Sequence, residues 1–203
     1  MSRLFALSLC LVVGACSSIS KDYPKKTFYA FEVSRGERVG APDEAPLLLV
    51  QRFRSGALSQ GLGLVYRTAP STYEADYYSE FFSEPEDLLT LTVAAWMADS
   101  GMFSATLGGT TEVEPDFVLQ GSLRNLYVDQ VTRGETRAVI EVQLFLTRRE
   151  RARSASVWHR DFRREELAKS PSGDDVLDAW NRGLASLLAE AEQELRAALS
   201  AAN

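Results

Sequence analysis

The chain carries few side chains that could perform covalent or acid–base catalysis. His159 is the one histidine among 203 residues, and it stands among charged neighbours in a segment that we expect to be a strand. One histidine does not by itself exclude a Ser-His-Asp site, but no nucleophile-elbow motif accompanies it. One histidine without a free cysteine also makes a transition-metal site with nitrogen and sulfur ligands improbable. We therefore interpret His159 as a surface or packing residue.

The carboxylates have structural explanations as well. Glu84–Asp87 and Asp174–Asp175 fall in the first turns of expected helices, where the helix dipole favours negative charge. Asp43–Glu44 and Glu165–Glu166 are adjacent pairs, whose side chains point apart along an extended chain. The glycine-rich stretches lack the lysine and threonine of a phosphate-binding loop. The sequence predicts a protein that is not an enzyme, with no cofactor and no metal.

The N-terminus has the pattern of a secretory signal peptide. Arg3 precedes an apolar run over residues 4–13, and the small residues Gly14 and Ala15 lead to Cys16. The run is shorter than the roughly 20 apolar residues that cross a bilayer. We expect residues 1–15 to be removed as a signal peptide.

Val13-Gly14-Ala15-Cys16 resembles the lipobox of bacterial lipoproteins, in which the cysteine is acylated. The resemblance implies lipidation of Cys16 and attachment to a membrane. The alternative is an ordinary signal peptide that leaves Cys16 as a free thiol. Ser17 and Ser18 stand where an aspartate would indicate retention in the inner membrane, so the resemblance implies an outer-membrane anchor facing the periplasm. Cys10 would leave with the signal peptide, which leaves no cysteine for a disulfide.

The charge balance argues against nucleic acid as a partner. Lys and Arg number 22 against 28 Asp and Glu, a net charge of −6, and an acidic surface repels phosphate backbones. A local basic run covers residues 148–153 between two expected strands. We interpret it first as a solvated turn and second as a docking place for an acidic partner.

Hydrophobic periodicity predicts one α+β domain over residues 27–203, joined to Cys16 by a polar tether over residues 16–26. Ser83 and Glu86 form a capping-box pattern before a helix that ends near Gly101. A second helix is expected from about Asp174 to Ala201; its apolar stripe either packs on the sheet or forms an oligomer seam. We expect two main helices against a mostly antiparallel sheet. Its strands are expected near residues 27–33, 47–53, 61–67, 75–82, 116–129, 137–147 and 156–162.

Aromatic residues are concentrated before the first helix. About half of those in residues 77–82 must point away from the core if that segment is a strand. Exposed aromatic side chains often mark an interface or an apolar ligand site, and the alternative is partial burial under a loop. The residues that we single out as a partner or lipid contact are Tyr66, Tyr77, Tyr78, Phe81 and Phe82.

The order of short motifs is similar to that of the auxiliary lipoprotein family of ABC-type transport systems, which includes PqiC-like proteins. The motifs are Gly63–Arg67, Tyr77–Tyr78, Phe81–Phe82, Glu84–Leu89, Ser100–Phe103, Asp116–Leu123, Arg137–Leu146 and Ala179–Arg182. A tryptophan that is common after the tyrosines in the family is replaced here by Phe82 or is absent.

The resemblance implies a non-catalytic outer-membrane component of a system that moves phospholipids or other apolar molecules between membranes. It also implies docking to an MCE-domain protein, and it leaves open a ring-shaped homo-oligomer. A different class remains open: a lipoprotein that activates a cell-wall synthase or forms part of a secretion channel. A hydrolase would require His159 for its activity.

Overall fold

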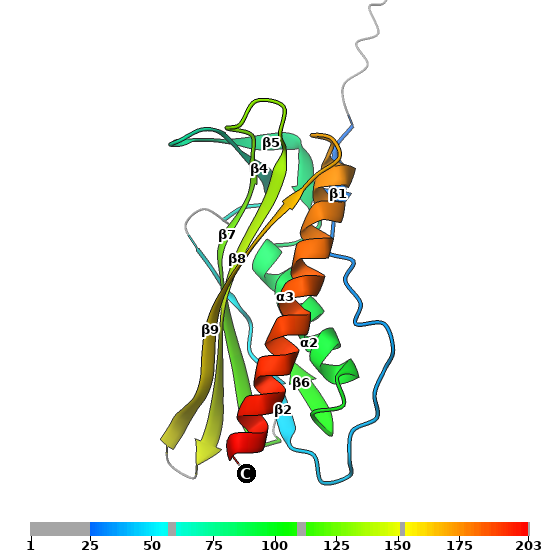
Figure 1. The fold of residues 1–203 in the computed structure, drawn as a ribbon, viewed down its shortest axis with the longest axis vertical. Coiled ribbons are helices and arrows are strands. Elements are labelled where there is room, and N and C mark those ends of the chain that lie inside the picture. Colours follow the sequence, from blue (N-terminus) through cyan, green and yellow to red (C-terminus); the bar gives the residue numbers. More distant parts are fainter. Residues whose placement is uncertain (1–24, 57–59, 109–112, 151–152, 203) are drawn as a thin grey trace, which may run out of the picture.

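The computed structural model describes residues 25–56, 60–108, 113–150 and 153–202. In this part of the chain, nine strands form one sheet, and two helices pack against it in a single α+β domain, as the sequence predicts (Figure 1). The expected signal peptide and Cys16 lie outside the described residues. No helix of the described part is both long and apolar enough to span a bilayer.

The helices are α2 (Pro85–Asp99) and α3 (Gly173–Ala202). The strands, in chain order, are β1 (Thr27–Tyr29), β2 (Leu47–Val50), β3 (Arg54–Ser55), β4 (Gly63–Ala69), β5 (Thr72–Phe81), β6 (Ala105–Gly108), β7 (Phe117–Asp129), β8 (Arg137–Glu150) and β9 (Arg153–Leu167). The short strands β3 and β6 were not predicted from the sequence.

The sheet is mixed rather than purely antiparallel, and most of its residue pairs are antiparallel, as the sequence predicts. The long strands β7, β8 and β9 form the expected antiparallel meander, and β4 pairs with β5 in the same way. The other pairings are parallel. β1 pairs with β5, β2 pairs with both β6 and β7, and β3 and β4 each pair with β7. Alternation of apolar residues shows which face of a strand is buried, but it does not give the direction of the neighbouring strand.

The first helix begins differently from the capping-box prediction. Its N-cap is Glu84, which makes no side-chain capping bond, and Pro85 occupies the first turn. Ser83 therefore does not cap α2. The predicted end is confirmed, because Gly101 has a φ of 70° just after the helix, a conformation that glycine adopts without strain.

The apolar stripe of α3 packs on the sheet. Trp180, Leu184 and Leu188 are buried, and the indole nitrogen of Trp180 donates a hydrogen bond to the Val139 carbonyl oxygen at 3.0 Å. The main contacts of α3 are with β8 and β9, whereas α2 lies against β2, β3, β6 and β7. Eight described residues of α3 belong to the hydrophobic core, as the packing interpretation predicts.

The segment from residue 30 to residue 46 joins the two ends of the molecule. It descends outside the helices from β1 to β2 (Figure 1). Hydrogen bonds hold it along the way, from the Glu32 amide to the Asn181 side-chain oxygen at 3.1 Å and from the Val39 amide to the Asp99 carbonyl at 3.0 Å. The described chain therefore starts at one end of the long axis and reaches the other end at β2.

Candidate functional site

Exposed aromatic side chains gather where β1 joins the sheet. β1 runs parallel to the end of β5, and the Phe82 amide donates a hydrogen bond to the Tyr29 carbonyl at 2.7 Å. Phe82 is 75% exposed and Tyr77 is 68% exposed, although both are large apolar side chains. We call this group the aromatic surface; its members are Phe28, Tyr77, Tyr78 and Phe82.

Two of the five aromatic residues singled out from the sequence lie elsewhere. Phe81 is only 2% exposed and packs between Phe31 and Trp180, so it belongs to the core. Tyr66 is half-buried in β4, and burial, followed by the nearby Asp76 carboxylate, raises the pKa of its hydroxyl to about 12. Phe28, which the sequence reasoning did not single out, joins the surface because β1 lies at the sheet edge.

A groove of about 530 Å³ lies at the opposite end of the molecule. Met102, Phe117 and Leu199 form apolar parts of its wall, and Arg148, Arg149 and Arg196 bring positive charge. The remaining lining residues are Pro42, Glu44, Ala45, Pro46, Gly101, Asp116 and Ser200. The groove thus combines apolar surface with cationic groups, a combination suited to an amphipathic or acidic partner.

Several contacts hold the side chains of the groove. The Arg148 guanidinium lies 5.2 Å from the centre of the Phe117 ring, within the range of a cation–π interaction. The Asp116 carboxylate accepts a hydrogen bond from the Leu47 amide at 2.8 Å, which ties β2 to the start of β7. Arg148 and Arg149 belong to the basic run that we interpreted first as a solvated turn. The structure places both on the groove wall, and the side chains of residues 150–154 lie outside the described part.

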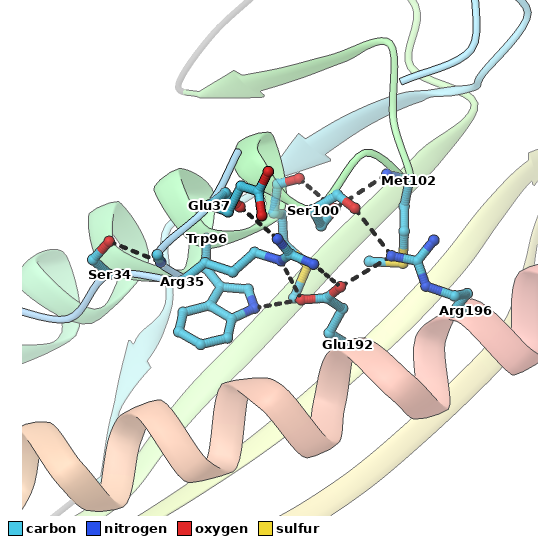
Figure 2. A network of polar contacts seen from close by, with 10 residues as sticks. Ser34, Arg35, Glu37, Trp96, Ser100, Met102, Glu192 and Arg196 are labelled. Carbon is cyan, nitrogen blue, oxygen red and sulfur yellow. Dashed lines mark hydrogen bonds and ion pairs between the residues drawn. The ribbon is translucent and has the colours of Figure 1, made fainter. Parts of the chain in front are cut away.

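A buried carboxylate fixes the helices behind this groove (Figure 2). Glu192 of α3 is 8% exposed, and its oxygens accept hydrogen bonds from Arg35 at 2.8 and 3.0 Å, from Arg196 at 3.0 Å and from the Trp96 indole at 3.0 Å. Arg196 also donates to the Ser100 carbonyl oxygen at 3.0 Å. The network thereby joins the 30–46 segment, α2 and α3, and it positions Arg196 at the groove.

The electrostatics of Glu192 follow from two opposing effects. Burial alone would raise the pKa of the Glu192 carboxyl. Hydrogen bonds from Arg35, Arg196 and Trp96 favour the ionised form more strongly, and they hold its pKa below its ordinary value. The carboxylate is therefore ionised at neutral pH and serves as the centre of a structural ion-pair network.

The other candidate residues stay apart in the described chain. His159 is exposed on β9, and its ring stacks on Phe145 with centroids 5.9 Å apart. Asp87 pairs with Arg52, whose Nη2 lies 3.0 Å from a carboxylate oxygen. Among the residues that the structure describes, no three His, Cys, Asp or Glu side chains are grouped as they would be to bind a metal ion. The prediction that the protein is not an enzyme stays a prediction.

Comparisons with known proteins support the fold. No family model matches the sequence, and no curated protein matches it. The structure is similar to the crystal structure of protein XCC0632 from Xanthomonas campestris, a DUF330 protein, with a TM-score of 0.71 and 20% identity over 82% of this chain and 92% of that one.

Two further solved structures are similar over most of their length. An uncharacterised protein gives a TM-score of 0.65 with 17% identity, over 84% of this chain and 99% of the other. The hypothetical protein CT253 from Chlamydia trachomatis gives a TM-score of 0.50 with 6% identity, over 73% and 96%. At these identities the likeness defines the fold alone: this chain has the fold of a DUF330 protein.

Proposed function

We propose that this chain is a lipoprotein anchored at Cys16 in the outer membrane, where it faces the periplasm as a non-catalytic component of an intermembrane lipid-transport system. The proposed partner is an MCE-domain protein of an ABC transport system, and the chain could act as one subunit of a homo-oligomer. The lipobox-like sequence at Cys16 and the likeness of the fold to a DUF330 protein support this proposal.

The observation that carries the proposal is the separation of the two ends of the domain. Gly173, at the start of α3, lies against the Tyr29 ring of β1, so closely that a Cβ atom would overlap it. Leu199, near the end of the same helix, lines the groove. The two positions are 26 residue steps apart, which corresponds to about 39 Å at the rise of an α-helix. A lipid anchor before β1 would therefore leave the groove about one domain length from the membrane, available to a periplasmic partner.

The anchor is tested by the intact mass of the protein extracted from membranes. The expected mass lacks residues 1–15 and includes acyl chains on Cys16. Cys16→Ser should abolish this modification, whereas Cys10→Ser, which changes a residue expected to leave with the signal peptide, should not. An unmodified Cys16 thiol would contradict the lipoprotein assignment.

The transport role is tested by capturing the tagged, lipidated protein from native membranes in mild detergent and identifying the co-purified proteins by mass spectrometry. Recovery of an MCE-domain protein would support the proposal. If this protein is lost with Arg149→Glu and kept with Arg133→Glu, the groove is the docking site. Arg133 is the control because it is also exposed but lies on the turn between β7 and β8, at the other end of the sheet. Recovery of a cell-wall synthase without an MCE-domain protein would overturn the transport role.

A further inference from the structure

We propose that the aromatic surface lies on the lipid bilayer that holds Cys16, so that the domain stands on the membrane with its groove pointing away. This inference rests on the proposed acylation of Cys16, and it adds a second contact with the membrane, made by the folded domain itself. The ligand is a phospholipid surface, and the contacting groups are aromatic rings from β1 and β5.

The first argument is the length of chain between the anchor and the surface. Lys25, the first residue that the structure describes, lies nine positions after Cys16. Whatever path the chain takes between them, it spans at most about 30 Å, because an extended chain covers roughly 3.3–3.6 Å per residue. Phe28 follows three residues later, so the aromatic surface is the part of the described domain that joins the tether. The groove lies about 39 Å further along α3 and cannot face the bilayer when this end does.

The second argument is the distribution of exposed apolar side chains. Isolated exposed apolar residues are normal on a soluble domain, but a cluster at one end is not. Of the nine large apolar side chains exposed in the described part of the chain, six lie at the end where β1 and the β4–β5 hairpin lie (Figure 1). They are the four members of the aromatic surface together with Val131 and Leu167. Asp129 and Leu167 both pair with Arg137, and Val131 follows Asp129 by two residues, so Val131 and Leu167 lie at the same end of the sheet.

The third argument is the chemistry of the side chains. Tyrosine and other aromatic rings with a polar edge favour the boundary between lipid head groups and acyl chains. Tyr77 and Tyr78 pack edge to face with their ring centres 5.2 Å apart, and the Lys26 ammonium lies 4.2 Å from the centre of the Tyr77 ring. Because Lys26 also pairs with the Glu80 carboxylate at 2.6 Å, its charge is balanced, and the aromatic rings make the contact with the head-group region.

The experiment uses the full lipidated chain reconstituted into phosphatidylcholine vesicles that contain a doxyl-labelled lipid as a quencher. A single new cysteine carries a fluorophore at Phe82→Cys or, as the matched control, at Leu91→Cys; Leu91 lies on α2 and is 68% exposed, close to the 75% of Phe82. We expect several-fold stronger quenching by the bilayer at position 82 than at position 91. Phe28→Ser with Tyr77→Ser should reduce the quenching at position 82 without releasing the protein from the vesicles.

Flotation and intact mass separate the two proposals. If the acylated protein floats with the vesicles but position 82 is quenched no more than position 91, the membrane contact is overturned while the anchor stands. If the fluorophore at position 82 is shielded only when a protein partner is added, the aromatic surface is a protein interface, and the membrane contact is likewise overturned. If Cys16 carries no acyl chain, both the anchor and the contact that rests on it are overturned.

Discussion

The indole nitrogen of Trp96 donates a hydrogen bond of 3.0 Å to the carboxylate of Glu192, although 96 residues separate them in the chain. The bond joins α2 to α3 in a buried setting, where an unpaired indole N–H or carboxylate would cost free energy. Arg35, from the segment that descends beside the helices, completes the pairing of Glu192 through two bonds. One carboxylate thus unites three parts of the chain behind the groove.

Glu192→Gln should lower the free energy of unfolding by about 2 kcal/mol, because it removes the charge that two arginines face in a buried place. Urea unfolding of the purified protein in mild detergent measures this loss. The control is Glu194→Gln, since Glu194 accepts a bond from Trp158 at 3.0 Å but is more exposed. An equal loss in both variants would show that Glu192 is not the centre of the network.

Acid should destabilise the protein through the same carboxyl. Because the pKa of Glu192 in the folded state lies below its ordinary value of 4.5, the unfolded chain binds a proton more readily than the folded one. The stabilising contribution of the Glu192 carboxylate is therefore complete above about pH 4.5, and it is lost as the pH falls through the folded-state pKa. Urea midpoints between neutral and acidic pH should decline less steeply in Glu192→Gln than in the native chain, and parallel profiles would contradict this prediction.

Trp96→Phe should reveal the coupling between the two helices. The phenyl ring retains most of the apolar contact but cannot donate the hydrogen bond, so we expect a loss of about 1–2 kcal/mol in the free energy of unfolding. In a double-mutant cycle with Glu192→Leu, which removes the acceptor oxygens, the two single losses should add to more than the loss in the double variant, by about 1 kcal/mol. Strictly additive losses would mean that the bond contributes nothing to stability.

Tyr66 should lose its hydroxyl proton at a higher pH than an ordinary tyrosine. Burial, with a smaller effect from Asp76, raises the pKa of its hydroxyl to about 12, so the folded state holds this proton more tightly than the unfolded chain. Its contribution to stability is complete below pH 10 and is lost as the pH rises toward about 12. Absorbance of the phenolate should show a late phase that disappears in Tyr66→Phe. A late phase that persists in this variant would assign it to another tyrosine.

Gly121→Ala should destabilise the sheet by about 1–3 kcal/mol, since a Cβ at this place in β7 would overlap the buried Phe53 ring. Gly108→Ala is the control, because a Cβ there meets no atom within 4 Å and should leave the free energy of unfolding nearly unchanged. Adding Phe53→Leu to Gly121→Ala should recover part of the loss by making room. Equal stability of the two glycine variants in thermal unfolding would count against the close packing of Phe53 on Gly121.

Local patterns predicted the elements of this protein well. Alternation along residues 137–147 predicted a half-buried strand, and β8 has its apolar residues Ile140, Val142 and Leu144 in the core. The stripe of α3 predicted a helix that packs on a sheet. Thr132 and Glu135 close the turn between β7 and β8 with a backbone hydrogen bond of 3.1 Å. These features depend on neighbours close in the sequence, which the period of apolar residues reports directly.

Residue patterns therefore predicted the single α+β domain, most of its strands and both helices. Four features became clear only from the three-dimensional arrangement of the chain: the parallel pairings of β7, the burial of Phe81, the addition of Phe28 to the aromatic surface and the partners of Glu192. Strand direction and ion pairs such as Arg35 with Glu192, 157 residues apart, depend on how distant segments meet. The periodicity of apolar residues records which face is buried but not against which partner, because any apolar surface can cover it.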